Sequence, residues 1–312
     1  MTDSKKIIIG AGPSGLIWKF YNPEFQIISP EVKNYTAHLV WMHDCYETRK
    51  LITDLGWSNV DKLIKISQIG YYYNGWISNS LTDEMNLQMI QKKMTEWDKP
   101  IDKNFVPKTR DLSLSTGGLM GINYMKTIDV DLEEVVRRLY EHSDIQHGFV
   151  THINEDSIST KHDLNDNNVD ITYYDKLIST IPAPFFWKAW GQNKEFKCLP
   201  ITNIIVSKKP STFDDKYEMI YYGEDQPYSR ISFLNGKYAI EFTGVISKEE
   251  FERLYPDLPI LSYFVVPQGR IFEVDNSPPS DKIIFSGRFA QWKYKVTTEF
   301  IISQALNYKN NV

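Results

Sequence analysis

The stretch IIIGAGPSGL, which runs from Ile7 to Leu16, decides the fold. An apolar run typical of a buried parallel strand enters a glycine-rich turn, and apolar residues at helical spacing follow. We predict a strand over Lys6–Ile9, a short helix over Ser14–Tyr21 and a second strand over Phe25–Ser29. Together these elements form a strand–helix–strand unit of minimal length.

The turn carries the spacing Gly-x-Gly-x-x-Gly. Gly10 allows a tight turn, Gly12 lets a pyrophosphate approach the backbone, and Gly15 lets the helix pack closely on the strand. The positive end of the helix dipole faces the same place, so Pro13 and Ser14 in the first turn also lie beside the ligand. Because the pattern follows a strand and opens a helix, we predict a dinucleotide site.

The end of the second strand departs from the usual dinucleotide pattern. An acidic residue at this point commonly binds the adenosine ribose. Here the strand ends at Ser29, and Pro30 and Glu31 follow it. Ser29 and Glu31 are therefore both candidates for the ribose contact.

Composition excludes several classes of protein. The net charge of −5 gives no broad attraction to DNA, RNA or an anionic membrane. No apolar run approaches the ~20 residues of a membrane-spanning helix. The two cysteines, Cys45 and Cys198, are too few for a disulfide framework and lack metal-ligand spacing. We expect a cytoplasmic protein without a metal site. Ile, Lys, Asn and Tyr are abundant, as in proteins from AT-rich genomes, which include viral ones, and a viral protein would lie in the host cytoplasm.

Hydrophobic periodicity divides the rest of the chain. Helical spacing predicts helices toward both ends, and alternating spacing predicts short strands between them. The predicted helices cover 48–57, 81–97, 131–141 and 297–308, and the predicted strand regions cover 148–182, 199–246 and 282–292. A β-rich middle between two α/β ends indicates that the C-terminus completes the first domain.

Two later segments resemble a known superfamily when they are taken with the glycine-rich turn. They are LISTIPA (177–183) and SGRFAQWKY (286–294). The three motifs resemble the FAD-binding superfamily of amine oxidases, protoporphyrinogen oxidase and UDP-galactopyranose mutase. The last motif, followed by IISQAL (301–306), is most similar to the mutase branch. AHLVWMH (37–43) resembles that branch's histidine-containing segment, with Trp41 where a second histidine is expected.

The resemblance implies an α/β fold with a discontinuous, Rossmann-like FAD-binding domain. Residues 1–70, 112–185 and 270–312 would form this domain. Residues 71–111 would form a small helical cap, and residues 186–269 a β-rich substrate domain.

The resemblance also implies FAD as the cofactor and assigns residues to it. Gly10, Gly12 and Gly15 would hold the pyrophosphate, and the Val150 backbone would contact adenine. Gly287 and Arg288 would lie near the pyrophosphate and ribityl chain, Thr297 would begin a helix aimed at the flavin pyrimidine ring, and Trp292 would line the site. A helix N-terminus at that ring favours the negative charge of reduced flavin.

Candidate substrate residues have two interpretations each. His38 either lies over the flavin or is a packed histidine, and Arg230 either holds a substrate phosphate, as the mutase resemblance implies, or is a strand-surface arginine. Tyr228, Trp292 and Tyr294 either line the cavity or belong to the core.

Three functions follow from these observations. The first is an amine-oxidase-type enzyme that oxidises or cleaves a C–N bond. Its substrate would be a small molecule or an amino-modified nucleotide or nucleobase, including one in phage DNA. The lysine-rich stretch 98–111 permits contact with DNA, but the net charge does not indicate it. The second is a mutase-like flavoenzyme acting on a nucleotide sugar. The third is a non-catalytic flavin-binding protein.

Overall fold

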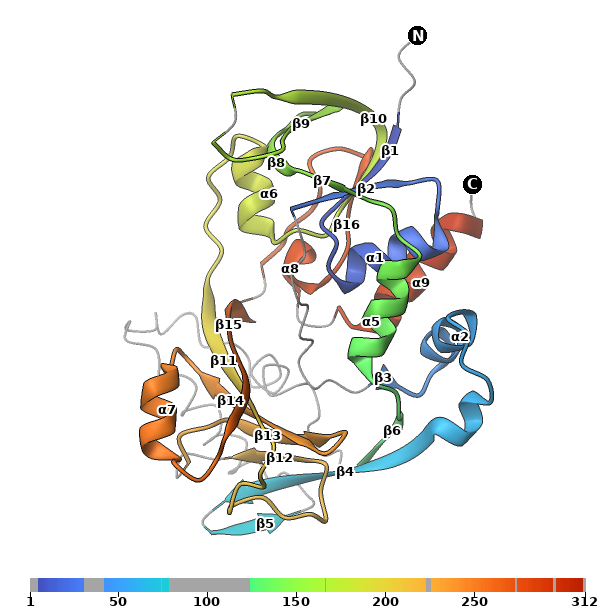
Figure 1. Cartoon of the computed structure of the whole chain (residues 1–312). Coiled ribbons are helices and arrows are strands. Elements are labelled where there is room, and N and C mark those ends of the chain that lie inside the picture. Colours follow the sequence, from blue (N-terminus) through green and yellow to red (C-terminus); the bar gives the residue numbers. More distant parts are fainter. Residues whose placement is uncertain are drawn as a thin grey trace.

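The computed structural model describes residues 5–30, 42–73, 75–78, 124–165, 167–222, 226–272, 274–293 and 296–310. The described residues form two sheets, one in each of two lobes (Figure 1). β1 and α9, at opposite ends of the chain, both lie in the upper lobe of Figure 1.

The first sheet contains the predicted strand–helix–strand unit. Its strands are β1 (Lys5–Ile9), β2 (Gln26–Ser29), β7 (Ile145–His147), β8 (Phe149–Ile153), β9 (Ser157–Lys161), β10 (Asp170–Ser179) and β16 (Ile283–Phe285). β7, β2, β1, β10 and β16 are adjacent in this order and pair in parallel. The first half of β10 pairs antiparallel with β9, and β9 with β8. The parallel part is the Rossmann-like unit that the sequence predicts.

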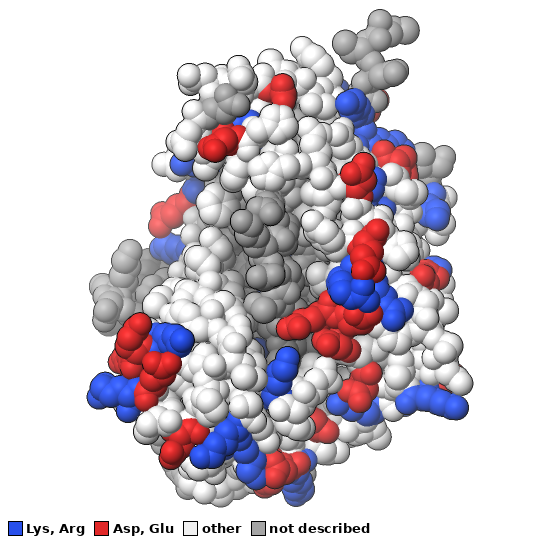
Figure 2. Space-filling model, in the orientation of Figure 1, with Lys and Arg blue, Asp and Glu red and all other residues white. Residues whose placement is uncertain are grey.

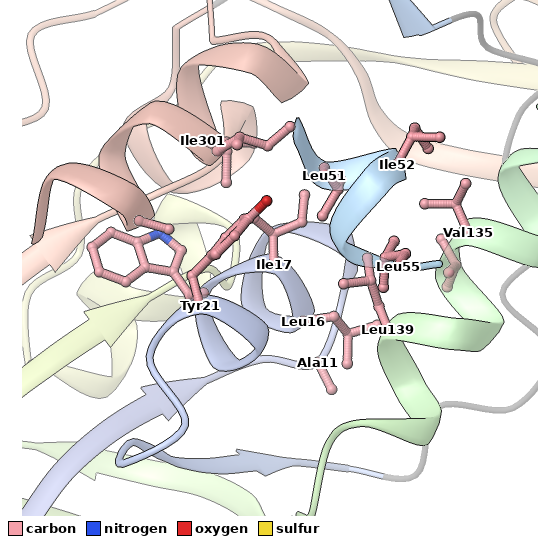
Figure 3. Packing of buried hydrophobic residues seen from close by; sticks show 14 of the residues in the cluster. Ala11, Leu16, Ile17, Tyr21, Leu51, Ile52, Leu55, Val135, Leu139 and Ile301 are labelled. Carbon is pink, nitrogen blue, oxygen red and sulfur yellow. The ribbon is translucent and has the colours of Figure 1, made fainter. Parts of the chain in front are cut away.

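Helices cover one face of this sheet and bury its largest apolar cluster. They are α1 (Pro13–Tyr21), α2 (Tyr46–Asp54), α5 (Leu132–Glu141) and α9 (Thr298–Asn310). Figure 3 shows how Leu16 and Ile17 of α1 meet Leu51 of α2, Leu139 of α5 and Ile301 of α9. All five side chains are buried. Packing of these apolar stripes holds the four helices together.

The local sequence explains where α5 begins and which face it buries. Asp131 precedes the helix, and its side chain accepts a hydrogen bond from the Glu133 backbone at 3.0 Å. Val135 and Leu139 recur at helical spacing and are buried. The Arg138 guanidinium lies 3.7 Å from the centre of the Trp57 ring and covers the end of this cluster.

The opposite face of the first sheet is covered by two short helices, α6 (Ala183–Ala189) and α8 (Arg288–Gln291). Phe186 of α6 packs edge-on against Phe285 of β16, with ring centres 4.7 Å apart. LISTIPA begins on β10, and SGRFAQWKY directly follows the adjacent strand β16. Both motifs continue into helices on the same face.

The second sheet makes up the lower lobe of Figure 1. Its described strands, in sheet order, are β15 (Ile260–Ile271), β11 (Cys198–Val206), β14 (Lys237–Thr243), β13 (Arg230–Leu234), β12 (Met219–Tyr222), β4 (Ile64–Tyr73), β6 (Tyr124–Ile128) and β3 (Met42–His43), with β5 (Trp76–Ser78) beside β4. β4 and β12 are parallel, and the other pairs are antiparallel. A short 3₁₀-helix, η1 (Val60–Leu63), leads into β4.

α7 (Lys248–Leu254) covers one face of the second sheet. Ile204, Ile231 and Ile240 point toward this helix and are buried with Phe251. Because side chains alternate between the two faces of a strand, the residues next to them in sequence occupy the opposite face. That opposite face carries the polar groups described below.

The predicted cap needs a correction at its start. Tyr71 and Tyr72 lie in β4 and residues 76–78 form β5, so both stretches belong to the second sheet. β4 pairs with β12, and Tyr71 stacks on Tyr221 of that adjacent strand, with ring centres 5.8 Å apart. Residues 79–123, with the predicted helix 81–97 and the stretch 98–111, lie outside the described residues. No described helix is long and apolar enough to span a membrane.

Candidate functional site

Three strands of the first sheet end side by side. Ile9, the last residue of β1, lies opposite Ser179 at the end of β10, and Ser179 lies opposite Phe285 at the end of β16. These are the carboxyl ends of parallel strands, which is the edge where α/β sheets bind their ligands. The three motifs that the sequence singles out meet at this edge.

The three glycines of the turn have different surroundings. Gly10 has a φ of +98°, and a Cβ on it would lie 2.6 Å from the Thr180 hydroxyl. A Cβ on Gly15 would lie 1.9 Å from the carbonyl oxygen of Gly10, so the helix touches the turn. A Cβ on Gly12 would meet no described atom within 4 Å. Gly10 and Gly15 therefore make the turn possible, whereas Gly12 faces open space.

The other two motifs support the turn directly. The Thr180 backbone N–H donates to the Ile9 carbonyl at 3.0 Å, and its hydroxyl donates to the carbonyls of Ile9 and Gly10. Ser286 accepts a hydrogen bond from Trp18 Nε1 of α1 at 2.7 Å and donates to Gln304 of α9 at 3.1 Å. Segments that lie far apart in sequence thus hold the β1–α1 turn in one conformation.

Gly287 and Arg288 lie beside the same turn. Gly287 has a φ of +98°, and a Cβ on it would lie 2.7 Å from the Ser14 hydroxyl. Arg288 follows as the first residue of α8 and is half-buried. The structure therefore brings Ser14 and Gly287 into contact, and Arg288 follows Gly287 in the chain.

The predicted adenosine end lies at β2. Ser29 is the last residue of this strand and is buried, and its carbonyl accepts a hydrogen bond from the Gly148 N–H at 3.0 Å. Val150 follows two residues later in β8 and is half-buried. Ser29 and Val150 therefore lie near each other, while Glu31 lies outside the described residues.

At the other end of the site, α9 begins at Thr298, one residue after the predicted Thr297. Trp292 differs from the expectation that it lines the site. Its side chain is fully buried and packs on Phe196, with ring centres 5.0 Å apart. α8 ends at Gln291, and Trp292 follows in a left-handed conformation that places its side chain in the apolar core. Its side chain therefore has no exposed surface for a ligand.

These residues fit the pyrophosphate of a dinucleotide. The N-terminus of α1 has no side-chain cap, and Pro13 occupies its first position. Its free backbone N–H groups and the helix dipole favour an anion at this point. Gly12 leaves the room that a pyrophosphate needs. The described residues contain no cluster of His, Cys, Asp and Glu that could hold a metal ion.

A second set of charged residues lies on the face of the second sheet opposite α7. Arg230 of β13 lies directly opposite Glu241 of β14, and its guanidinium donates to Glu241 Oε2 at 2.6 Å. Arg270 of β15 donates to the other oxygen of Glu241. We call these three residues the Arg–Glu–Arg cluster.

Burial and charge act in opposite directions on this cluster. Burial by itself lowers the pKa of Arg230, but Glu241 and the Tyr221 hydroxyl outweigh it, so the pKa is raised. For the Tyr221 phenol, which is neutral when protonated, burial instead raises the pKa. Two arginines thus share the single carboxylate of Glu241, so the cluster has one net positive charge.

Sequence reasoning found Arg230 but missed Glu241 and Arg270. One signal was present, because Glu241 is a single acid within the strand YAIEFTG. A buried carboxylate needs cationic partners, so a lone acid in an apolar strand points to arginines on neighbouring strands.

Tyr228 does not share a site with Arg230. It is buried in the cluster on the α7 side, and its hydroxyl lies 2.5 Å from that of Thr212. A cavity of about 250 Å³ adjoins it there, lined also by Lys208 and Tyr255. His38 and Tyr294 lie outside the described residues.

A larger cavity of about 690 Å³ lies elsewhere on the first lobe. It is bounded by Phe20 and Tyr21, at the last turn of α1, and by Leu306 and Asn307 of α9. This is the end of α1 opposite to Gly12, so the cavity is separate from the predicted cofactor site.

His43 of β3 connects the second sheet to the start of α9. Its Nδ1 lies 2.5 Å from Glu299 Oε1. The hydrogen bond to Glu299 raises the pKa of His43. Burial alone raises the pKa of Glu299, but hydrogen bonds from His43, Thr297 and the backbone outweigh it and lower the pKa to about 2.

Surface charge gives no sign of a nucleic-acid interface on the face shown in Figure 2. Acidic and basic side chains of the described residues are interspersed there, and no broad basic area appears among them. A stripe of Lys and Arg is the usual electrostatic feature of a nucleic-acid-binding surface.

Comparisons with known proteins agree with this architecture. No family model and no curated protein sequence matches the chain. Among solved structures, a reduced UDP-galactopyranose mutase matches with a TM-score of 0.60 and 11% identity, covering 100% of this chain and 94% of the other. An oxidoreductase from Methanosarcina mazei gives a TM-score of 0.59 at 10% identity, covering 98% and 100%.

A redesigned putrescine oxidase gives a TM-score of 0.57 at 11% identity, covering 99% of this chain and 98% of the other. These likenesses extend over nearly the whole length of the chains. They confirm the predicted fold class and, at the level of the fold, the resemblance that the sequence motifs indicated. The chain has the fold that UDP-galactopyranose mutase and putrescine oxidase share.

Proposed function

We propose that this protein is an FAD-dependent oxidoreductase. The observation that carries the proposal is Gly12, which faces open space where three parallel strands end and the uncapped N-terminus of α1 begins. A turn built only for packing would need Gly10 and Gly15 but would have no use for glycine at position 12. The shared fold with solved flavoenzymes supports the same assignment.

The chain's own residues would bind and orient the cofactor. Backbone N–H groups at Gly12 and Ser14 would bind the pyrophosphate, and Arg288 would add a positive charge beside it. The N-terminus of α9 would supply the positive end of a dipole for the flavin ring. When bound, FAD supplies the ability to accept or donate a hydride.

Amine-oxidase-type chemistry, which acts on a C–N bond, is the reaction that we propose first. It is supported by the motifs in the sequence and by the likeness to putrescine oxidase. The substrate that we propose is a small amine-bearing molecule or an amino-modified nucleotide or nucleobase, including one in DNA. The protein would hold the reacting carbon near the flavin and exclude water.

A mutase-like reaction on a nucleotide sugar is the second candidate. One observation favours it, because Arg230 and Arg270 lie together on the second sheet and guanidinium groups bind phosphate well. The likeness to UDP-galactopyranose mutase agrees with this alternative.

The test compares FAD binding by the natural chain and by Gly12→Val. Gly12 has φ −70° and ψ 175°, which any residue adopts, so the variant should fold normally. We expect the natural chain to bind FAD and the variant to lose binding with an unchanged melting temperature without FAD. Equal FAD binding by both chains would contradict the proposed site.

A second experiment separates the candidate reactions. Anaerobic mixing of the flavin-loaded protein with amines bleaches the flavin in the first case. Conversion of UDP-galactose after reduction with dithionite supports the second case. A protein that binds FAD and does neither would be a non-catalytic flavin-binding protein.

A further inference from the structure

The cavity of about 690 Å³ on the first lobe lies where three helices end. Tyr21, Asp54 and Asn310 are the last residues of α1, α2 and α9, and all three line the cavity. Its volume is that of a small-molecule site. Gly12 lies at the other end of α1, so this cavity and the predicted cofactor site are separate.

The helix ends give the cavity an electronegative character. A helix carries partial negative charge at its C-terminus, and the C-termini of α1, α2 and α9 meet here. The charged side chains of the lining balance one another, because they are Glu47, Lys50, Asp54 and Lys309. The three helix ends therefore leave an excess of negative charge, which favours a cationic ligand.

Asp54 offers an acceptor to such a ligand. Its Oδ2 accepts hydrogen bonds from the Tyr21 hydroxyl at 3.1 Å and from Lys50 Nζ at 2.9 Å. Its Oδ1 accepts none from the part of the chain that the structure describes, and the side chain is 31% exposed. The bond from Lys50 shows that this carboxylate takes up an ammonium group. The lone pairs of Oδ1 are available to a second cationic donor.

Tyr21 positions this carboxylate. Its side chain is buried, and burial together with the Asp54 carboxylate raises the pKa of the phenol well above its ordinary value. The phenol therefore stays protonated and keeps donating to Asp54 Oδ2. This bond holds the carboxylate in one orientation on the wall of the cavity.

Aromatic rings form the wall beside Asp54. Phe20 and Tyr46 line the cavity together with Tyr21, and Phe20 packs edge-on against Tyr21, with ring centres 5.2 Å apart. Tyr46 is 71% exposed, so its ring is accessible to a ligand. Aromatic faces attract cations, and the rings also cover the apolar part of a ligand.

From these observations we propose that this cavity binds a small organic cation, an amidinium or ammonium group on an apolar body. The cationic group donates to Asp54 Oδ1, and the apolar body packs against Phe20 and Tyr46. The proposal goes beyond the proposed function, because it adds a second binding site that does not depend on the cofactor.

The experiment measures the heat of binding of three probes to the full-length chain in the presence of FAD, at neutral pH and equal ionic strength. The probes share one shape, since benzamidinium is a cation, benzamide is neutral and benzoate is an anion. Benzamidinium has no hydrogen on the carbon between its nitrogens, so a flavin cannot oxidise it. We expect saturable binding of benzamidinium, binding of benzamide that is about tenfold weaker or more, and no binding of benzoate.

Asp54→Asn removes the charge and keeps the shape of the side chain. It should weaken the binding of benzamidinium about tenfold or more and leave that of benzamide unchanged. Asp61→Asn is the matched control, because Asp61 pairs with Arg49 at 2.8 Å outside the cavity and is 82% exposed. The control should bind all three probes as the natural chain does.

Tyr46→Ala tests the aromatic wall and leaves the core intact, because this ring is exposed. The melting temperature should stay nearly unchanged, and benzamidinium should bind about threefold more weakly or worse. Tyr140→Ala, at an exposed ring of α5 away from the cavity, should bind benzamidinium like the natural chain.

Three results would overturn the proposal. They are benzamide or benzoate binding as tightly as benzamidinium, unchanged benzamidinium binding by Asp54→Asn or by Tyr46→Ala, and no binding of any probe. Flavin absorbance of the same samples tests the proposed function separately. A chain that holds FAD but not benzamidinium overturns only the second site, and a chain that binds benzamidinium without FAD overturns only the proposed cofactor.

Discussion

Gly12 and Gly15 lie three residues apart but are glycines for different reasons. The space beside Gly15 is filled by the Gly10 carbonyl, and the space beside Gly12 is open. The two glycines therefore meet two separate requirements. Gly15 allows the helix to pack closely on the turn, and Gly12 leaves access for a ligand.

A pair of alanine substitutions separates these requirements. Gly15→Ala should lower the free energy of unfolding by ~3 kcal/mol or more, because backbone atoms of a tight turn cannot move aside. Gly12→Ala should leave the stability of the FAD-free chain unchanged within ~0.5 kcal/mol. Urea unfolding of both variants measures this, and equal losses would show that both glycines serve packing alone.

Glu241 makes a second prediction at the residue scale. Glu241→Ala leaves two arginines in a poorly solvated place without a counter-charge, so it should cost ~3–5 kcal/mol. Asp215→Ala, on an ion pair with Lys209 whose side chains are 44% and 67% exposed, should cost ~1 kcal/mol or less. Similar losses in denaturant unfolding would argue against a buried, organising role for Glu241.

At the scale of elements, α1, β16 and α9 are connected through one buried hydroxyl. Ser286 accepts from Trp18 and donates to Gln304. Ser286→Ala should cost ~1–3 kcal/mol, because the buried Trp18 N–H then has no acceptor. Ser303→Ala, at a half-buried position of α9 whose hydroxyl only accepts a 3.4 Å hydrogen bond from the exposed Asn307, is a control with a smaller expected effect. Equal melting temperatures of the two variants would contradict the connection.

The ion pair of His43 with Glu299 makes the attachment of α9 depend on pH. The folded pKa of His43 is raised above 6.5, so its contribution to stability is complete below the unfolded pKa and is lost as pH rises through the folded one. The lowered pKa of Glu299 keeps the carboxylate charged throughout this range. The melting temperature of the natural chain should therefore fall as pH rises from about 6 to 9.

His43→Gln should remove this part of the pH dependence. His162→Gln, at an ion pair with Asp170 in which both side chains are more than half exposed, should keep it. A His43→Gln variant whose melting temperature falls with pH as steeply as that of the natural chain would show that the pair does not anchor α9.

Some elements were predictable from local sequence and others were not. β1, α1 and β2 have apolar patterns and turn glycines that specify them locally, and α5 has a capping Asp131 and an apolar stripe. β4, β6 and β15 were missed because their exposed and buried residues alternate weakly, and their partners are distant in sequence. The predicted site shows the same limit, since Arg270 reaches Glu241 only through a bulge that no local pattern indicates.

At the scale of the whole molecule, the two sheets present different chemical groups. The first sheet gathers three motifs at one edge, where the chain offers open space and a helix N-terminus to an anion. The second sheet presents charged side chains on the face that α7 leaves uncovered. The glycine-rich turn was readable from sequence because it needs particular backbone conformations, whereas the Arg–Glu–Arg cluster depends on side chains brought together from three strands.

The most direct test of the central claim is the binding of FAD to the full-length chain, measured by visible absorbance after gel filtration. We predict that the natural chain retains about one FAD per molecule and that Gly12→Val, folded to the same melting temperature, retains none. A natural chain that elutes without flavin absorbance and does not bind added FAD would contradict the account.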